Sequence, residues 1–200
     1  MMRVANVLHL CHKAVQKRRG KISDRFNQPN GGLRLIMLGV LLIDLAVIAL
    51  SVDFFNLRLP DYWPGMASIF GGLLISIIII RISRPKLFWD WIALGTLHTT
   101  LGFLLTKSPS LWSSQSFVVF CALLLATAIL RLWIGATLVQ WNGRSYLLAS
   151  GLTGLFCTGW AVATRLTSSP TSPDFILAVD LLITGLSIAG LGLSLRQSPS

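Results

Sequence analysis

Apolar and polar positions divide the chain into six long apolar stretches that are separated by short, more polar connections. We place the stretches at 33–54, 65–82, 87–106, 115–139, 145–165 and 174–195. Each is about as long as a helix must be to cross a hydrocarbon core of roughly 30 Å. A β-barrel would show alternation at every second residue, and these stretches do not alternate. The pattern therefore predicts an all-α integral membrane protein with six transmembrane helices.

The six stretches repeat in pairs along the chain. Gly39, Gly95 and Gly151 each lie about a third of the way along the first stretch of a pair, and successive members are 56 residues apart. A fixed period of this kind is typical of a repeat architecture. We therefore expect three repeated helical hairpins.

Composition and charge agree with a lipid environment and predict an orientation. Hydrophobic residues make up 54% of the chain and charged residues 12%, and a water-soluble domain of that composition would expose large apolar patches. Thirteen Lys and Arg residues fall on the side of the N-terminus and three on the other, while Arg131 falls within a stretch. Because basic residues favour the cytoplasmic side, the N- and C-termini are both predicted to be cytoplasmic.

The predicted organisation has three parts. Residues 1–32 are expected to form a basic, amphipathic cytoplasmic arm, residues 33–195 the six-helix membrane domain, and residues 196–200 a short cytoplasmic tail. The net charge is +10, and eight of the seventeen basic residues lie in the first 34 positions. This distribution favours attraction of the arm to anionic lipid head groups of the bilayer, and it argues against nucleic acid as a partner.

Four ionisable residues fall within the apolar stretches and form a candidate intramembrane polar site: Asp44, His98, Arg131 and Asp180. Such residues usually face the interior of a helix bundle, because charge in lipid is unfavourable. Judged by depth, Asp44 and Arg131 are predicted to form an ion pair, with His98 bridging or relaying protons. Asp180 is expected to lie too near the outer end to join them.

Two interpretations of this cluster stay open. One is a functional proton or ligand site, and the other is a structural ion pair, or an Arg131 side chain that extends to the surface. Small residues four positions apart predict close helix contacts elsewhere, at Ala122 and Ala126, at Ser150 and Gly154, and at Gly185 and Ala189.

Motifs for catalysis, cofactors and metals are missing from the sequence. It has no glutamate, no Gly-rich loop followed by Lys-Ser or Lys-Thr, and no Gly-x-Ser-x-Gly element. Its three cysteines do not suggest a disulfide framework, and His9 and His12 have no third metal ligand nearby. We therefore predict a protein that is not an enzyme and that has no catalytic residues, no cofactor-binding residues and no metal site.

Two segments carry a family resemblance. One is the last apolar stretch, from Ile176 to Arg196, in which Asp180 and Gly185 stand in an Asp-Leu-Leu-x-x-Gly pattern. The other is Ala128-Ile-Leu-Arg131 with Gly135, a short basic turn and Leu147-Leu-Ala-Ser-Gly151. Together they resemble the HdeD-like bacterial membrane proteins, with Arg131 at the position of a common family arginine. The likeness extends over roughly residues 34–196, and the basic arm and the Asp44 region depart from the pattern.

The resemblance implies a six-helix protein of the plasma (inner) membrane, in a family linked to acid resistance in at least one enteric member. We therefore expect a multi-pass membrane protein with a role in acid or stress tolerance. One alternative is a small transporter or proton-conducting protein that works through Asp44, His98 and Arg131. Another is an accessory subunit of a larger membrane complex, and a homo-oligomer is a further possible assembly.

Overall fold

The computed structural model describes residues 31–55, 62–82, 85–107, 114–138, 143–167 and 173–197. Residues 1–30 of the predicted basic arm and the final residues of the predicted tail lie outside these ranges, whereas Gly31 and Gly32, predicted as the end of the arm, belong to the first described helix. Within them the chain is entirely helical, with six helices in order: α2 (Gly31–Phe55), α3 (Trp63–Ile82), α4 (Pro85–Lys107), α5 (Ser114–Thr137), α6 (Arg144–Leu166) and α7 (Pro173–Gln197). Each helix begins and ends within two residues of its predicted apolar stretch, so the all-α prediction is confirmed.

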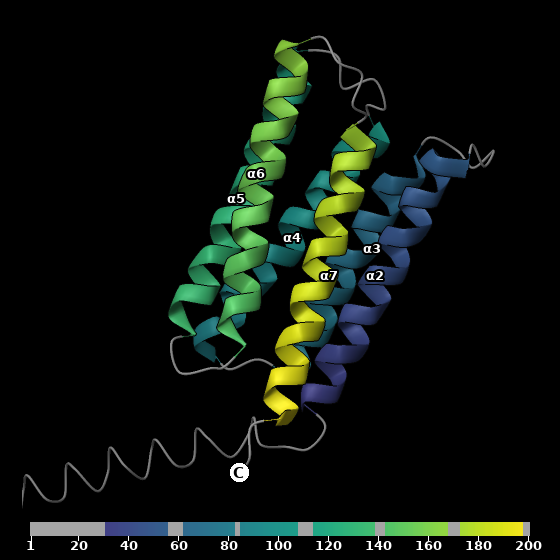
Figure 1. Cartoon of the computed structure of the whole chain (residues 1–200). Coiled ribbons are helices and arrows are strands. Elements are labelled where there is room, and N and C mark those ends of the chain that lie inside the picture. The colour runs from purple at the N-terminus through teal and green to yellow at the C-terminus, as the bar shows by residue number, and fades with distance from the viewer. Residues whose placement is uncertain are drawn as a thin grey trace, which may run out of the picture.

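The helices lie side by side in one elongated bundle (Figure 1). Five of them, α2, α3, α5, α6 and α7, are long and apolar enough to cross a membrane. Helix α4 has a similar length of 23 residues, but it contains Asp90, His98 and several threonines and is not among these five. The described helices therefore indicate a membrane protein.

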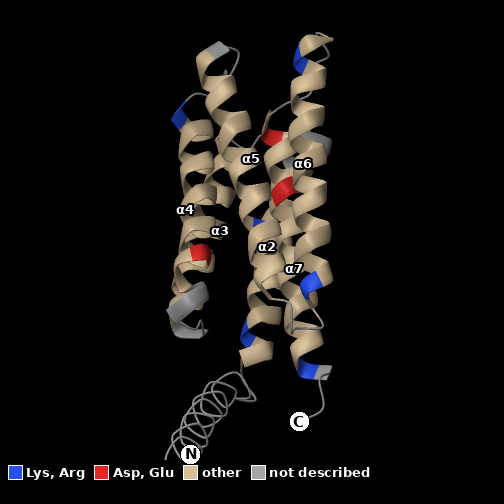
Figure 2. Cartoon of the chain, turned by 90° about the vertical axis from the view of Figure 1, so that its left-hand side faces the viewer, with Lys and Arg blue, Asp and Glu red and all other residues tan. Residues whose placement is uncertain are grey.

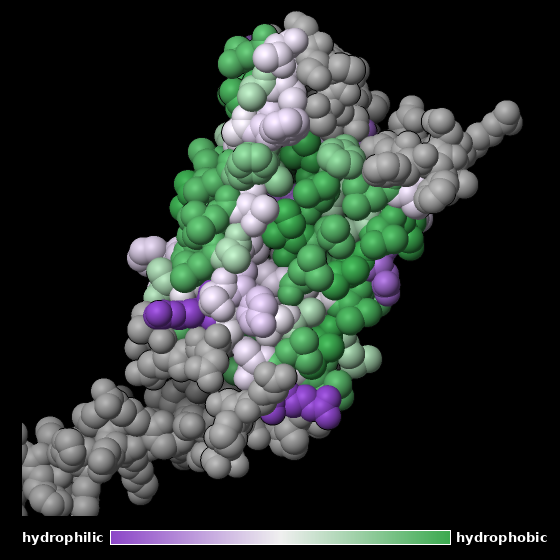
Figure 3. Space-filling view, viewed as in Figure 1, coloured by the Kyte–Doolittle hydropathy of each residue, from purple (hydrophilic) through white to green (hydrophobic). Residues whose placement is uncertain are grey.

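The surface supports the same conclusion. Large apolar side chains such as Trp89, Phe156 and Leu152 are exposed on the outside of the bundle, and hydrophobic colouring covers much of the face seen in Figure 3. Charged residues are sparse along the helices and are found mainly near their ends (Figure 2). An exterior of this kind suits hydrocarbon and would be unfavourable in water.

The closest helix contacts are made by two antiparallel pairs, α2 with α7 and α3 with α4. All four helices carry two glycines that are seven residues apart and face the partner: Gly32 and Gly39, Gly185 and Gly192, Gly65 and Gly72, and Gly95 and Gly102. A Cβ added at Gly39 would lie only 2.6 Å from the backbone nitrogen of Ala189 and 2.7 Å from the carbonyl oxygen of Gly185. Contacts this close allow backbone van der Waals packing and Cα–H···O interactions.

The third close pair, α5 with α6, is built differently. Gly151 faces the side chain and backbone nitrogen of Leu132, and Gly154 faces Ala128. Of the three glycines spaced by 56 residues, Gly39 packs on α7, Gly95 on α3 and Gly151 on α5.

Of the small residues predicted to mediate contacts, Ser150 and Gly154 are buried in α6 and Gly185 is buried in α7. Ala122 is exposed, so the prediction for α5 was wrong. The buried face of this helix is offset from Ala122 and instead contains Thr127, Ala128 and Arg131.

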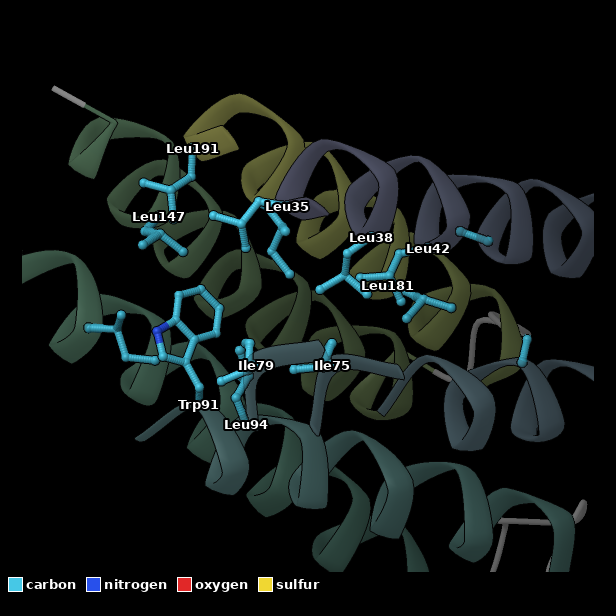
Figure 4. Close-up of a cluster of buried hydrophobic side chains, with 14 of the residues drawn as sticks. Leu35, Leu38, Leu42, Ile75, Ile79, Trp91, Leu94, Leu147, Leu181 and Leu191 are labelled. Atoms are coloured by element: carbon cyan, nitrogen blue, oxygen red, sulfur yellow. The ribbon is translucent and has the colours of Figure 1, made fainter. Parts of the chain in front are cut away.

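The larger apolar core contains buried residues from all six described helices. Figure 4 shows Leu38 and Leu42 of α2 near Leu181 of α7, with Ile75 of α3 and Leu94 of α4 on the other side. A second apolar cluster includes Leu101 and Leu105 of α4, Phe120 and Leu124 of α5, and Leu177 of α7. The second cluster draws on α4, α5, α6 and α7, and three of these helices, α4, α5 and α7, carry the buried ionisable residues described next.

Candidate intramembrane polar site

A buried ion pair joins α5 to α7. The Nη2 group of Arg131 donates a hydrogen bond to Oδ1 of Asp180. Both side chains are almost completely removed from the surface, with 0% and 1% exposure. In an apolar interior each charge compensates the other, and neither would be tolerated well alone.

Helix α5 itself holds the Arg131 side chain in place. Its Nε donates to the carbonyl oxygen of Thr127 at 3.3 Å, and its Nη2 also donates to Oγ1 of Thr127 at 3.2 Å. The hydroxyl of Thr127 in turn donates to the carbonyl oxygen of Leu124 at 2.7 Å. Side chains on a helix point toward its N-terminus, so Arg131 reaches back by one turn.

A glycine on α6 leaves room for the guanidinium. A Cβ added at Gly154 would lie 3.5 Å from Nη2 of Arg131 and 3.0 Å from Cβ of Ala128. A larger residue at this position would therefore press on the ion pair from the α6 side.

His98 is the third ionisable member of the site. Its side chain on α4 is completely buried, and it interacts electrostatically with both Asp180 and Arg131. The hydroxyl of Ser68 on α3 donates to the carbonyl oxygen of His98 at 2.9 Å, which ties this turn of α4 to α3. Three ionisable side chains from three helices therefore share one interior region.

The site has spare hydrogen-bonding capacity. Among the described residues, no partner is found for four of its buried polar atoms: Nδ1 and Nε2 of His98, Nη1 of Arg131 and Oδ2 of Asp180. Buried polar atoms are usually paired, and these four include both donors and acceptors. Such a group is chemically suited to exchanging a proton or to holding a small polar molecule.

The structure brings together three of the four predicted site residues, but not in the predicted pairing. Arg131 pairs with Asp180, so the expected Asp44–Arg131 pair was wrong. Asp44 is exposed on the outer side of α2, because the opposite side of that helix carries the buried Leu38, Leu42 and Ala46. The expectation that Asp180 lies too near the outer end to reach Arg131 was also wrong, since the long Arg131 side chain extends along its own helix and meets this carboxylate.

Other candidate groups do not add to this site. Cys121 and Cys157 are half-buried free thiols that pack against the second apolar cluster. Within the six described ranges, no group of three or more His, Cys, Asp or Glu residues is arranged to hold a metal ion. Cys11, His9 and His12 lie outside those ranges.

Comparison with known proteins gives no family model, no curated protein and no solved structure that matches this chain.

Proposed function

We propose that this chain is a six-span, multi-pass protein of the plasma (inner) membrane, of the HdeD-like type, that serves in acid or stress tolerance without catalysis. One observation carries the proposal: the buried His98 interacts with the Arg131–Asp180 ion pair inside the apolar bundle. A cluster that can gain a proton in this position gives the membrane domain a way to respond to acid.

The response follows from charge balance. The cluster consists of the guanidinium of Arg131, the carboxylate of Asp180 and the imidazole of His98. The imidazole of His98 and the carboxylate of Asp180 can each take up a proton, whereas the guanidinium of Arg131 is already fully protonated. A proton on His98 would leave two cations facing the single carboxylate of Asp180, and a proton on Asp180 would leave Arg131 without a counter-charge. Either event weakens the contact between α5 and α7.

The distribution of basic residues supports the proposed orientation. The helix ends next to the described start and finish of the chain carry Arg34, Arg144 and Arg196, while the opposite ends carry Lys107 and Arg165. The larger number of basic residues at the end of the bundle that contains Arg34 and Arg196 agrees with cytoplasmic termini and six crossings. The equal spacing of Gly39, Gly95 and Gly151 supports three repeated hairpins.

A small transporter or proton-conducting protein is the second candidate function. The observation in its favour is the set of unpaired polar atoms on His98, Arg131 and Asp180, since intramembrane ionisable groups often belong to proton or substrate paths. Proteoliposomes with an internal pH dye test it. Dissipation of an imposed pH gradient that is lost in His98→Gln supports conduction, and a gradient that persists with the wild-type chain contradicts it.

Survival of cells after a drop to low pH tests the leading proposal. Four strains are compared: gene deleted, gene restored, and gene restored as His98→Gln or as Thr96→Ala. Thr96 is exposed on the same helix and serves as the matched control. We expect deletion to reduce survival, and we expect Thr96→Ala to restore it while His98→Gln does not. Unchanged survival on deletion contradicts the role, and full rescue by His98→Gln at equal protein levels removes His98 from the mechanism.

A further inference from the structure

Asp44 lies at the middle of α2 on its outward side. It follows the first residue of the helix by thirteen positions and precedes the last by eleven. Its side chain is exposed, and it takes part in no hydrogen bond or ion pair with the described residues. At this depth an exposed carboxylate faces hydrocarbon, which is strongly unfavourable unless another group compensates it.

Asp44 is the centre of a regular stripe along α2. Met37, Leu41, Asp44, Ile48 and Ser51 follow one another at alternating intervals of four and three residues. Met37 is 59% exposed, Leu41 44% and Ile48 42%, so the apolar members project outward as well. Alternating intervals of this kind are typical of a helix–helix seam, and one polar residue within such a seam fixes its register.

We propose that this α2 seam, defined by these five residues, binds a transmembrane helix of a partner protein that carries Lys or Arg at mid-depth opposite Asp44. A basic side chain would both neutralise the carboxylate and donate hydrogen bonds to it. The apolar members of the seam would pack on either side of this pair. The site is separate from the polar site of His98, Arg131 and Asp180 and does not depend on its function.

A second copy of this chain fits the seam less well. Arg131 is fully buried and already paired with Asp180. The other described basic residues that have an assigned exposure are near helix ends: Arg34, Lys107, Arg144, Arg165 and Arg196. Among these residues, none would be available at mid-depth on the surface of a second copy. Charge complementarity therefore favours a different protein that carries its own intramembrane cation.

Binding of synthetic helices to the full chain in phosphatidylcholine vesicles tests this inference. The probes are Leu/Ala transmembrane helices with a single central Lys or a central Leu, and association is measured by energy transfer. The wild-type chain should bind the Lys probe about tenfold more tightly than the Leu probe, a difference typical of strong interhelical polar contacts. Comparison of two probes on the unaltered chain does not depend on the folding of any variant.

Variants then locate the effect. In Asp44→Asn the preference for the Lys probe should disappear. The double variant Asp44→Leu with Leu125→Asp keeps the composition and moves the carboxylate to an exposed position on α5. It should show no preference for the Lys probe over the Leu probe. Equal binding of both probes by the wild-type chain overturns the proposal. The proposal is also overturned if Asp44→Asn or the double variant still prefers the Lys probe. Self-association of the chain that displaces both probes overturns it as well.

Discussion

Arg131 has the largest of the described side chains that are buried completely, and its position depends on groups from three helices. Thr127, one turn earlier on α5, and Asp180 on α7 both accept hydrogen bonds from the guanidinium, and Gly154 on α6 leaves space for it. Removing either charge leaves the other without compensation in an apolar interior, which is far more unfavourable than losing both.

We therefore predict strong non-additivity between these two positions. Arg131→Leu and Asp180→Leu should each lower the free energy of unfolding by about 3–5 kcal/mol, the usual effect of breaking a buried pair. The double variant should be much closer to wild type than the sum of the two. Unfolding in mixed micelles with increasing sodium dodecyl sulfate measures all four proteins.

A double-mutant cycle between Asp44 and Arg131 is the control for the cycle between Arg131 and Asp180. Because Asp44 is exposed on the outer side of α2, Asp44→Leu should change stability little in micelles, and its effect should add to that of Arg131→Leu within about 0.5 kcal/mol. Coupling between Asp44 and Arg131, or additive effects of the Arg131 and Asp180 changes, would contradict the pairing described here.

The members of the polar site can be predicted from the sequence, but the way they pair cannot. Charge in an apolar stretch is visible in any sequence, so His98, Arg131 and Asp180 could be identified. Which way a helix is rotated depends on the neighbours it packs against, and this placed Asp44 on the outside. The length and direction of the Arg131 side chain added a further turn of reach that backbone depth does not include.

At the scale of helices, the positions of the elements could be predicted and their closest partners could not. Long apolar stretches bounded by prolines and polar residues define where helices begin and end. The pairing of α2 with α7 is distant in sequence, and the predicted hairpins gave no reason to expect it. A signal was present, because the glycines at 32 and 39, and at 185 and 192, share a spacing of seven residues, which keeps one side of a helix toward a single partner.

Two alanine substitutions test the importance of these contacts. A Cβ at Gly39 would meet backbone atoms of α7 at 2.6 and 2.7 Å, so Gly39→Ala should force the pair apart and lower stability by about 1–3 kcal/mol, as overpacking usually does. Gly159 on α6 has no atom within 4 Å of its added Cβ. Gly159→Ala should therefore be neutral or raise stability by up to about 1 kcal/mol through helix propensity. Thermal unfolding in detergent compares the two, and equal effects would refute the close packing of Gly39.

At the scale of the whole molecule, the number of membrane crossings depends on α4. Five of the described helices are long and apolar enough to cross a membrane, while α4 is not among them and contains the buried His98. It lies against α3 along matched glycines, so its less apolar side chains are partly enclosed by protein. A helix whose polar residues face the bundle can span a membrane at lower hydropathy than an isolated one.

Labelling of single cysteines decides the number of crossings. In a chain whose three native cysteines are replaced, Arg34→Cys and Arg196→Cys should react with a membrane-impermeant thiol reagent from the cytoplasmic side. Lys107→Cys and Arg165→Cys should react from the opposite side. Six crossings place Arg34 and Arg196 on the same side of the membrane, whereas five would place them on opposite sides. Labelling of these two positions from opposite sides would rule out the proposed topology.

The pairing of α2 with α7 also has a consequence for the order in which the protein is made. Among the described helices, a ribosome releases α2 first and α7 last, so the glycine surface of α2 enters the bilayer long before its partner has been synthesised. Arg131 is likewise synthesised before Asp180, its partner on the last described helix. Membrane insertion of the first five helices therefore produces an open intermediate with an uncompensated arginine, and arrival of the last helix both closes the bundle and neutralises that charge.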